Sequence, residues 1–296
     1  MNARRSTNIE YLSSIMRIFL SMSDSRVGVL DSNATFQPWA LRTTGPPVKE
    51  AEPTALDVEH MTAFAAVSPT VFVIGDGEGG VFQYNTETQE MTRLGNHRYN
   101  VTALLVLKDG RLVSADADGT VYFWDLTTKT VVAEIDEIIH SLHQDKYFEE
   151  PIVSLVQAPD GRLLILTASG LSTWDVANQE PQELMGYTTE SLATCVTVLT
   201  DGRIAIGTAA GTIEILDEAS SVWETLDGHG DVVSAICPLS RNGMASVAED
   251  GAMFVWNLES GEIVDAMMSF GADTFLKKEG DRIVYWKDGL KEWIFG

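Results

Sequence analysis

The chain has 296 residues, of which 45% are hydrophobic, so it is long enough to bury a substantial core. It carries 43 acidic against 20 basic residues, a formal net charge of −23 at pH 7. A surface this negative repels phosphate backbones and anionic lipids, which disfavours direct binding to nucleic acid. No apolar run approaches the ~20 residues that a membrane-spanning helix needs, so we expect no membrane insertion.

The first 22 residues decide the predicted location. The apolar stretch 15–20 is interrupted by Arg17, which makes it too short and too charged for the core of a secretion signal. We therefore predict an intracellular protein, cytoplasmic or nuclear. A mitochondrial presequence is the alternative, because Arg4, Arg5 and several serines stand in the same stretch.

One pattern of four residue types occurs at two places in the chain. A His is followed 17 residues later by a Ser, 21 residues later by an Asp and 27 residues later by a Trp. The two sets are His97, Ser114, Asp118 and Trp124, and His229, Ser246, Asp250 and Trp256. Identical offsets in two places indicate a duplicated structural unit.

Tight turns extend this repeat along the chain. Gly is favoured where a hairpin turn needs a positive φ, and Asp-Gly between alternating apolar residues is a strong hairpin signal. In chain order, the aligned turns fall at Ser25, Gly79, Gly119, Gly170, Gly211, Gly251 and Gly289. Five of them have a second turn Gly upstream, at Gly110, Gly161, Gly202, Gly243 and Gly280. Together with a third connection after the Trp position, each unit reads as four short strands.

With these units the chain resembles the WD40 β-propeller family. The resemblance implies an all-β fold, a seven-bladed WD40-type β-propeller with four-stranded antiparallel blades, and a single domain over residues 1–296. The expected blades are 7–42, 61–95, 101–135, 152–186, 194–227, 232–267 and 270–296. Two insertions, 43–60 and 136–150, are expected between blades; the Gly-Pro-Pro start of the first predicts an extended loop.

The resemblance also implies a structural role for the two quartets. In the family, the His, Ser, Asp and Trp side chains hydrogen-bond in series. The same residue types invite comparison with a Ser-His-Asp hydrolase, but that reading needs an exposed nucleophile, whereas each Ser lies inside a predicted strand and the set is duplicated. We expect no catalytic residue.

Other candidate sites for a cofactor or metal are weak. His140 and His143 have spacing that places them on one side of a helix, but no third and fourth ligand can be named. The run 75–80, Gly-Asp-Gly-Glu-Gly-Gly, carries two acids and no Lys, which argues against a phosphate loop. We expect no cofactor, no metal and no small-molecule substrate.

Acidic residues gather around particular connections. The propeller places both insertions and several turns on one face, which we expect to receive a basic peptide or a basic partner subunit. Adaptation to high salt is an alternative explanation of the charge. The candidate partner-binding acids are Glu50, Glu52, Asp57, Glu59, Glu78, Asp136, Glu137, Asp145, Glu149 and Glu150.

The last blade supplies a second interaction hypothesis. Residues 290–295 end with Trp293 and Phe295, and the sequence accounts for three strands of this blade but not for an outer fourth. The last blade is therefore predicted to be either three-stranded or completed by another strand, with Trp293 and Phe295 as candidate contacts.

These features predict a non-catalytic scaffold or adaptor that mediates protein–protein interactions within a larger intracellular complex. The alternative is a propeller enzyme, a hydrolase or lyase, with its site at the channel mouth. That alternative needs convergent His or carboxylate side chains on inner strands, and the inner runs 101–107, 152–156 and 232–236 are mostly apolar.

Overall fold

The fold is described by a computed structural model. It describes residues 17–23, 26–31, 35–40, 48–58, 60–135, 151–168, 170–178, 180–182, 191–239, 242–268, 276–279, 282–286 and 290–294. Within these ranges the regular elements are all β-strands. No helix in the described part of the chain has the length and hydropathy needed to cross a membrane.

The strands form seven antiparallel sheets in the described residues, consistent with the seven predicted blades. The first sheet holds β1 (Arg17–Ser23), β2 (Arg26–Asp31), β3 (Thr35–Ala40), β4 (Val48–Lys49) and β5 (Thr54–Ala55). The second holds β6 (Met61–Ala66), β7 (Val71–Asp76), β8 (Gly80–Asn85) and β9 (Glu90–Asn96). The third holds β10 (Val101–Val106), β11 (Leu112–Asp116), β12 (Val121–Asp125) and β13 (Thr130–Ile135).

The remaining sheets follow in chain order. The fourth holds β14 (Ile152–Gln157), β15 (Leu163–Thr167), β16 (Leu171–Asp175) and β17 (Glu180–Gln182). The fifth holds β18 (Ala193–Val198), β19 (Ile204–Thr208), β20 (Thr212–Asp217) and β21 (Val222–Asp227). The sixth holds β22 (Val233–Pro238), β23 (Gly243–Ala248), β24 (Ala252–Asn257) and β25 (Glu262–Met268). The seventh holds β26 (Leu276–Glu279), β27 (Arg282–Trp286) and β28 (Leu290–Ile294).

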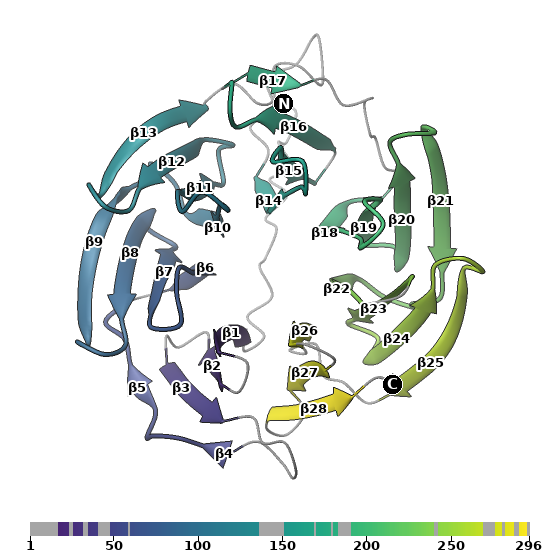
Figure 1. Cartoon of the computed structure of the whole chain (residues 1–296), viewed down its shortest axis with the longest axis horizontal. Helices are drawn as coiled ribbons and strands as arrows, with labels where there is room; N and C mark the ends of the chain where they lie inside the picture. The colour runs from purple at the N-terminus through teal and green to yellow at the C-terminus, as the bar shows by residue number, and fades with distance from the viewer. Residues whose placement is uncertain are drawn as a thin grey trace, which may run out of the picture.

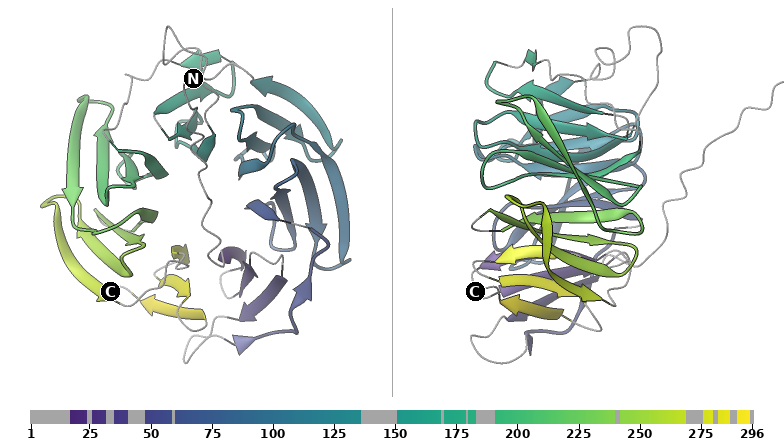
Figure 2. Two further views of the ribbon diagram at one scale, coloured as in Figure 1. Left: turned by 180° about the vertical axis from the view of Figure 1, so that it is seen from behind. Right: turned by 90° about the vertical axis from the view of Figure 1, so that its right-hand side faces the viewer.

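The sheets are arranged as blades around a ring (Figure 1). The first strand of each blade lies innermost, and contacts run from β1 to β6, β10, β14, β18, β22 and β26 and back to β1. The ring is a thick disc with two faces when seen edge-on (Figure 2). We call the face with the blade-to-blade connections and the second turn of each blade the histidine face, after His97 and His229. The opposite face, with the first and third turns, is the arginine face, after Arg111, Arg162 and Arg203.

Burial decreases from the second strand of a blade to its outer strand. Every residue of β11, β15 and β19 is buried, because both sides of these strands pack against a neighbouring blade. The outer strands β13, β21 and β25 are mostly exposed. Second strands that are buried throughout and outer strands that are mostly exposed fit such a radial arrangement.

The first blade differs from the sequence prediction. The segment 43–60, expected to be an extended insertion, supplies β4 and β5, which both pair with β3 and take the outer position of this blade. β1 ends at Ser23 and β2 begins at Arg26. The turn predicted at position 25 therefore falls between the first and second strands, and not between the second and third as in the other blades. A two-residue strand next to Gly-Pro-Pro leaves too little alternation to be recognised from sequence.

The last blade is three-stranded in its described residues, with β28 outermost (Figure 1). This agrees with one of the two forms predicted for it. Trp293 belongs to β28, and Phe295 lies outside the described residues.

Candidate functional site

Each of the two histidine networks begins at a buried imidazole in the connection between two blades. His97 lies between β9 and β10, and His229 lies between β21 and β22; both side chains have 0% exposure. His97 stacks on Tyr122 with ring centroids 4.4 Å apart, and His229 stacks on Phe254 at the same distance. The third and sixth blades therefore hold their imidazoles in the same way.

The hydrogen bonds run in series from the Trp to the Asp. In the sixth blade, Trp256 Nε1 donates to Ser246 Oγ at 2.7 Å, and Ser246 Oγ lies 2.7 Å from His229 Nε2. His229 Nδ1 lies 3.2 Å from Asp250 Oδ2. Because the Asp250 carboxylate can only accept, a neutral imidazole in this place carries its proton on Nδ1, and its Nε2 then accepts from the Ser246 hydroxyl.

The electrostatics agree with a neutral imidazole. Burial lowers the pKa of His229 below its ordinary value and outweighs the attraction of Asp250. Partial burial favours a higher pKa for Asp250, but N–H groups of Gly230 and Ala252, together with His229, outweigh it, and the pKa of this carboxyl is lowered. The His229–Asp250 contact is therefore a hydrogen bond to a carboxylate, not a pair of full charges.

The third blade corrects one predicted residue. Trp124 Nε1 donates to Ser114 Oγ at 2.7 Å, and Ser114 Oγ lies 2.6 Å from His97 Nε2, as in the sixth blade. The carboxylate at 3.2 Å from His97 Nδ1, however, belongs to Asp116 and not to the predicted Asp118.

Asp116 takes this place because it also closes the turn. Its Oδ1 accepts from the N–H groups of Asp118 and Thr120, while its Oδ2 meets the imidazole. In the second blade, Asp76 Oδ1 accepts from Glu78 and Gly80 in the same way. The sequence carried a signal for this, since Asp76 and Asp116 each stand three residues before an aligned turn Gly.

The third-blade network has the hydrogen-bond order of a hydrolase triad, but its serine is not accessible to a substrate. Asp116, His97 and Ser114 are linked in the order that a Ser-His-Asp triad uses. Ser114 has 0% exposure and its oxygen also accepts from Trp124. A substrate carbonyl cannot reach this oxygen, so the arrangement holds the blade together and performs no acyl transfer.

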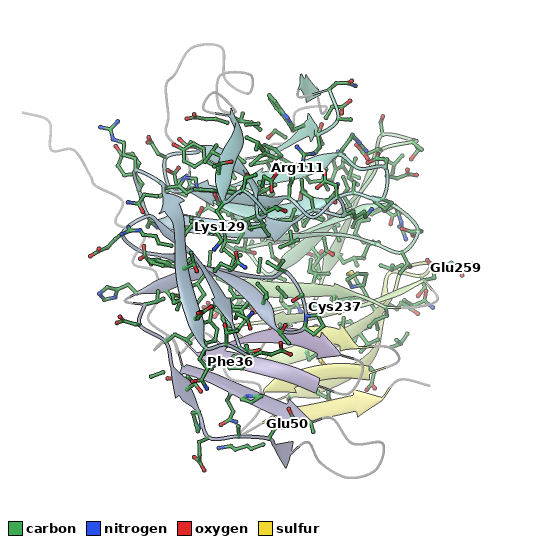
Figure 3. The ribbon with its side chains drawn as sticks, turned by 60° about the vertical axis from the view of Figure 1, so that its left-hand side comes forward. Phe36, Glu50, Arg111, Lys129, Cys237 and Glu259 are labelled. Atoms are coloured by element: carbon green, nitrogen blue, oxygen red, sulfur yellow. The ribbon has the colours of Figure 1, made fainter. Side chains whose placement is uncertain are left out.

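The acidic candidates are dispersed. Asp57 and Glu78 are exposed and lie on the histidine face, after β5 and between β7 and β8. Glu50 and Glu52 lie between β4 and β5, on the outer part of the first blade and not on the predicted face (Figure 3). Glu59, Asp136, Glu137, Asp145, Glu149 and Glu150 lie outside the described residues.

The two faces differ in charge. On the histidine face, the described connections hold one basic residue, Arg98, and six acids: Asp57, Glu78, Asp118, Asp231, Glu249 and Asp250. The described turns of the arginine face hold six acids, Glu87, Asp109, Asp160, Asp201, Glu218 and Glu259, and five bases, Lys108, Arg111, Lys129, Arg162 and Arg203.

The described residues hold no arrangement typical of a metal site or a reactive thiol. No group of three His, Cys, Asp or Glu side chains there is arranged to hold a metal ion. Cys195 and Cys237 are not disulfide-bonded, and burial raises the pKa of Cys195 to about 11. A thiol with this pKa is protonated at neutral pH and is a poor nucleophile.

Comparison with known proteins agrees with this geometry. The family model "WD domain, G-beta repeat" matches residues 88–125, which span the third-blade network. The WD40 β-propeller domain of Doa1 has the same fold, with a TM-score of 0.73 over 95% of this chain and 92% of that one, at 15% identity. One stretch of this chain thus matches the WD40 repeat, and the chain has the fold of a β-propeller.

Curated relatives are distant and longer. WD repeat-containing protein 91 of Pongo abelii is 22% identical over 89% of this chain and 34% of its own length. The WD repeat-containing protein 55 homolog of Dictyostelium discoideum is 24% identical over 58% of the chain and 40% of its own length. Cilia- and flagella-associated protein 57 of Mus musculus is 24% identical over 58% of the chain and 14% of its own length. The chain thus spans less than half of each of these relatives.

Proposed function

We propose that this WD40 propeller is a non-catalytic scaffold that binds protein partners, and that its histidine face receives a basic peptide or a basic subunit. The observation that carries the proposal is the charge of that face, six acids against one arginine in its described connections. Complementary charge accelerates and orients association with a basic partner. The matches to WD repeat proteins support a scaffold role.

The buried networks support the non-catalytic part of the proposal. Both serines of the networks are fully buried and each accepts a hydrogen bond from a Trp indole. The His, Ser and Asp residues have the types of a catalytic triad, but in the structure they stabilise two blades. No observation in the described residues favours the alternative of a propeller enzyme.

The test neutralises the histidine face while the fold is kept. The variant Asp57→Asn/Glu78→Gln/Asp231→Asn changes three exposed acids that accept no hydrogen bond needed by a buried group. The control Glu87→Gln/Glu259→Gln/Glu262→Gln removes the same charge from the arginine face and from β25. The probe is a fluorescent peptide of alternating Lys and Gly, titrated at low and moderate salt.

We expect the histidine-face variant to bind this peptide several-fold more weakly than the control, with a shallower salt dependence. Equal loss in both variants would show that only the net charge matters and would contradict a dedicated face. Full binding by the histidine-face variant would contradict the proposal directly.

Strand addition at β28 is a second candidate, supported by a last blade with three described strands where the other blades have at least four. An exposed sheet edge offers backbone N–H and C=O groups to a partner strand. Cross-linking of a captured partner to residues 290–294, lost in Trp293→Ala and kept in the histidine-face variant, would support this mode. Cross-links confined to the histidine face would contradict it.

A further inference from the structure

Three consecutive blades carry the same Asp-Gly-Arg turn on the arginine face. In each turn the Arg Nε donates to the Asp two residues before it, at 2.7–2.9 Å. The pairs are Asp109 with Arg111, Asp160 with Arg162 and Asp201 with Arg203. This repetition allows the three arginines to be compared position by position.

Arg162 and Arg203 each bind a second carboxylate. Arg162 forms two hydrogen bonds with Glu218 of the next blade, at 3.0 Å and 2.7 Å. Arg203 bonds Glu224 of its own blade at 3.2 Å and also the carbonyl oxygen of Leu258 in the next blade. An arginine of this turn therefore accommodates two carboxylates in the negative field of this protein.

Arg111 has one carboxylate where its counterparts have two. The pairing of β15 with β16 and of β19 with β20 aligns Trp174 with Leu216, so Val176 stands where the next blade has Glu218. Ala133 pairs with Phe123 where Glu224 pairs with the equivalent Ile215. Among the described residues, the guanidinium of Arg111 has Asp109 as its only acceptor, and it lies 5.7 Å from the centre of the Phe123 ring.

A hollow lies beside this arginine. A cavity of about 130 Å³ between the third and fourth blades is lined by Phe123, Ile135, Trp174 and Val176 together with Arg111, Ala133 and Glu134. It adjoins a more open groove of about 450 Å³ that shares Arg111 and Val176. The lining is mostly apolar and includes one cation, Arg111, and one carboxylate, Glu134. Apolar walls beside a cationic N–H donor suit an apolar side chain next to an anion. Figure 3 shows Arg111 among the strands of this part of the disc.

The three acids that line the open groove have partners already. Asp109 and Asp160 each bind the Arg of their own turn, and Asp175 accepts from the backbone of Ala177 and from Asn178. The hydrogen bond from Arg111 is the main cause that lowers the pKa of Asp109. A basic ligand would compete with these contacts, whereas an acidic one adds the second carboxylate that the sister arginines have.

We propose that this groove binds an acidic peptide segment of a protein partner. A Glu or Asp carboxylate of that segment pairs with Arg111, in the role that Glu218 plays for Arg162, and a neighbouring apolar side chain fills the cavity between Phe123 and Trp174. This site lies on the arginine face, so it is independent of the basic partner proposed for the histidine face.

The experiment selects ligands without assuming their sequence. A random peptide display library is panned on the full chain, with Arg111→Gln as the counter-selection target, and the enriched peptides are synthesised with a fluorescent label. We expect them to carry an acid within two positions of an apolar residue. Replacing that acid by its amide, or the apolar residue by Ala, should weaken binding at least about tenfold.

Two variants test the comparison between blades. Val176→Glu and Ala133→Glu each place a carboxylate of the chain where a sister blade has one, so each should satisfy Arg111 internally and weaken the peptide at least about tenfold. Val264→Glu, on the exposed outer strand β25, adds the same charge far from the groove and should have little effect. Thermal unfolding of each variant checks that it is folded.

Three results would overturn the proposal: no peptide that depends on Arg111, enriched peptides without an acid, or equal binding to wild type, Val176→Glu and Ala133→Glu. Because none of these variants changes the histidine face, failure here leaves the basic-partner proposal standing. Likewise, if the variant Asp57→Asn/Glu78→Gln/Asp231→Asn kept full binding of the basic peptide, the acidic-peptide proposal would still stand.

Discussion

Single polar side chains decide how two blades are fixed to their neighbours. The His–Ser–Trp contacts lie within 2.6–2.7 Å in both networks, and their Ser residues are fully buried. A buried hydrogen bond adds only ~1 kcal/mol net, but a buried donor left without an acceptor costs ~1–3 kcal/mol. The networks therefore matter chiefly because removing one member leaves the others unsatisfied.

Asp116 and Asp118 provide a direct test of the corrected network. Asp116→Ala removes the acceptor of two backbone N–H groups and of His97, so we expect it to lower the free energy of unfolding by about 1–3 kcal/mol. Asp118→Ala removes a half-buried side chain that accepts none of these bonds, and we expect a change within about 0.5 kcal/mol. Urea unfolding of both variants measures the difference; a larger loss in Asp118→Ala would restore the original assignment.

His229 predicts a loss of stability in mild acid. Its pKa is lowered in the folded state, so below the ordinary value of 6.5 the unfolded chain binds a proton that the folded chain resists. Stability is then complete above pH 6.5 and falls as the pH decreases below it, by at most about 1.4 kcal/mol per pH unit for this group. Urea unfolding at pH 7.5 and pH 5.5 measures the fall.

His229→Gln is the control for this titration. The variant should be less stable at both pH values, but it should lose less between them than the wild type does. An equal loss in wild type and variant would assign the acid sensitivity to other groups. The lowered pKa of Asp250 acts in a separate window, since its contribution is lost only below pH 3.8.

At the scale of elements, the two kinds of turn use glycine for different reasons. Gly211, in the second turn of its blade, has φ of +85°, and a Cβ there would lie 2.5 Å from the carbonyl oxygen of His229. Gly202, in the first turn of the same blade, has φ of +93° and nothing within 4 Å of such a Cβ. Gly211 is therefore needed for both space and backbone conformation, whereas Gly202 is needed for backbone conformation alone.

This difference predicts unequal costs for the same substitution. Gly202→Ala should cost about 1–2 kcal/mol for the left-handed backbone. Gly211→Ala should cost at least about 2 kcal/mol more, because the methyl group meets a carbonyl that joins two blades. Chemical unfolding of the two variants side by side tests this, and equal costs would mean that the connection at His229 yields without strain.

How far the sequence predicts these elements depends on how local their determinants are. The His, Ser and Trp of the networks are recognised because strand register fixes their offsets within one unit. Asp116 was missed because two acids stand in one turn and the offset alone favoured Asp118. The strands β4 and β5 were missed because two residues show no period.

The groove beside Arg111 could not be predicted from the sequence, for another reason. It exists because Val176 and Ala133 stand where sister blades have Glu218 and Glu224. Each relation joins separate strands or separate blades, and only the paired register shows which positions correspond. The structure also shows that the arginines of these turns are bound to carboxylates.

At the scale of the whole molecule, charge opposes compactness. A net charge of −23 on a disc of this size produces self-repulsion that salt screens, with a Debye length of roughly 30 Å at 0.01 M and roughly 10 Å at 0.1 M. We expect the Tm at pH 7 to rise by a few degrees when sodium chloride is raised from low to moderate concentration.

Potassium chloride should give the same rise, because screening depends on ionic strength and not on the identity of the cation. A rise with one salt only would indicate a specific ion site. A fall in Tm with both salts would mean that the ion pairs on the arginine face contribute more than the self-repulsion costs, which would contradict the expectation.

The contact between β1 and β26 has a consequence for how the molecule is assembled. Hairpins within a blade form between neighbours in the chain, and so does the packing of each inner strand on the next. The seam between the first and last blades is different, because it joins strands from opposite ends of the described chain and requires every intervening blade to be in place. A nascent polypeptide would therefore hold most of its architecture as an open arc, and would become a ring in its last step.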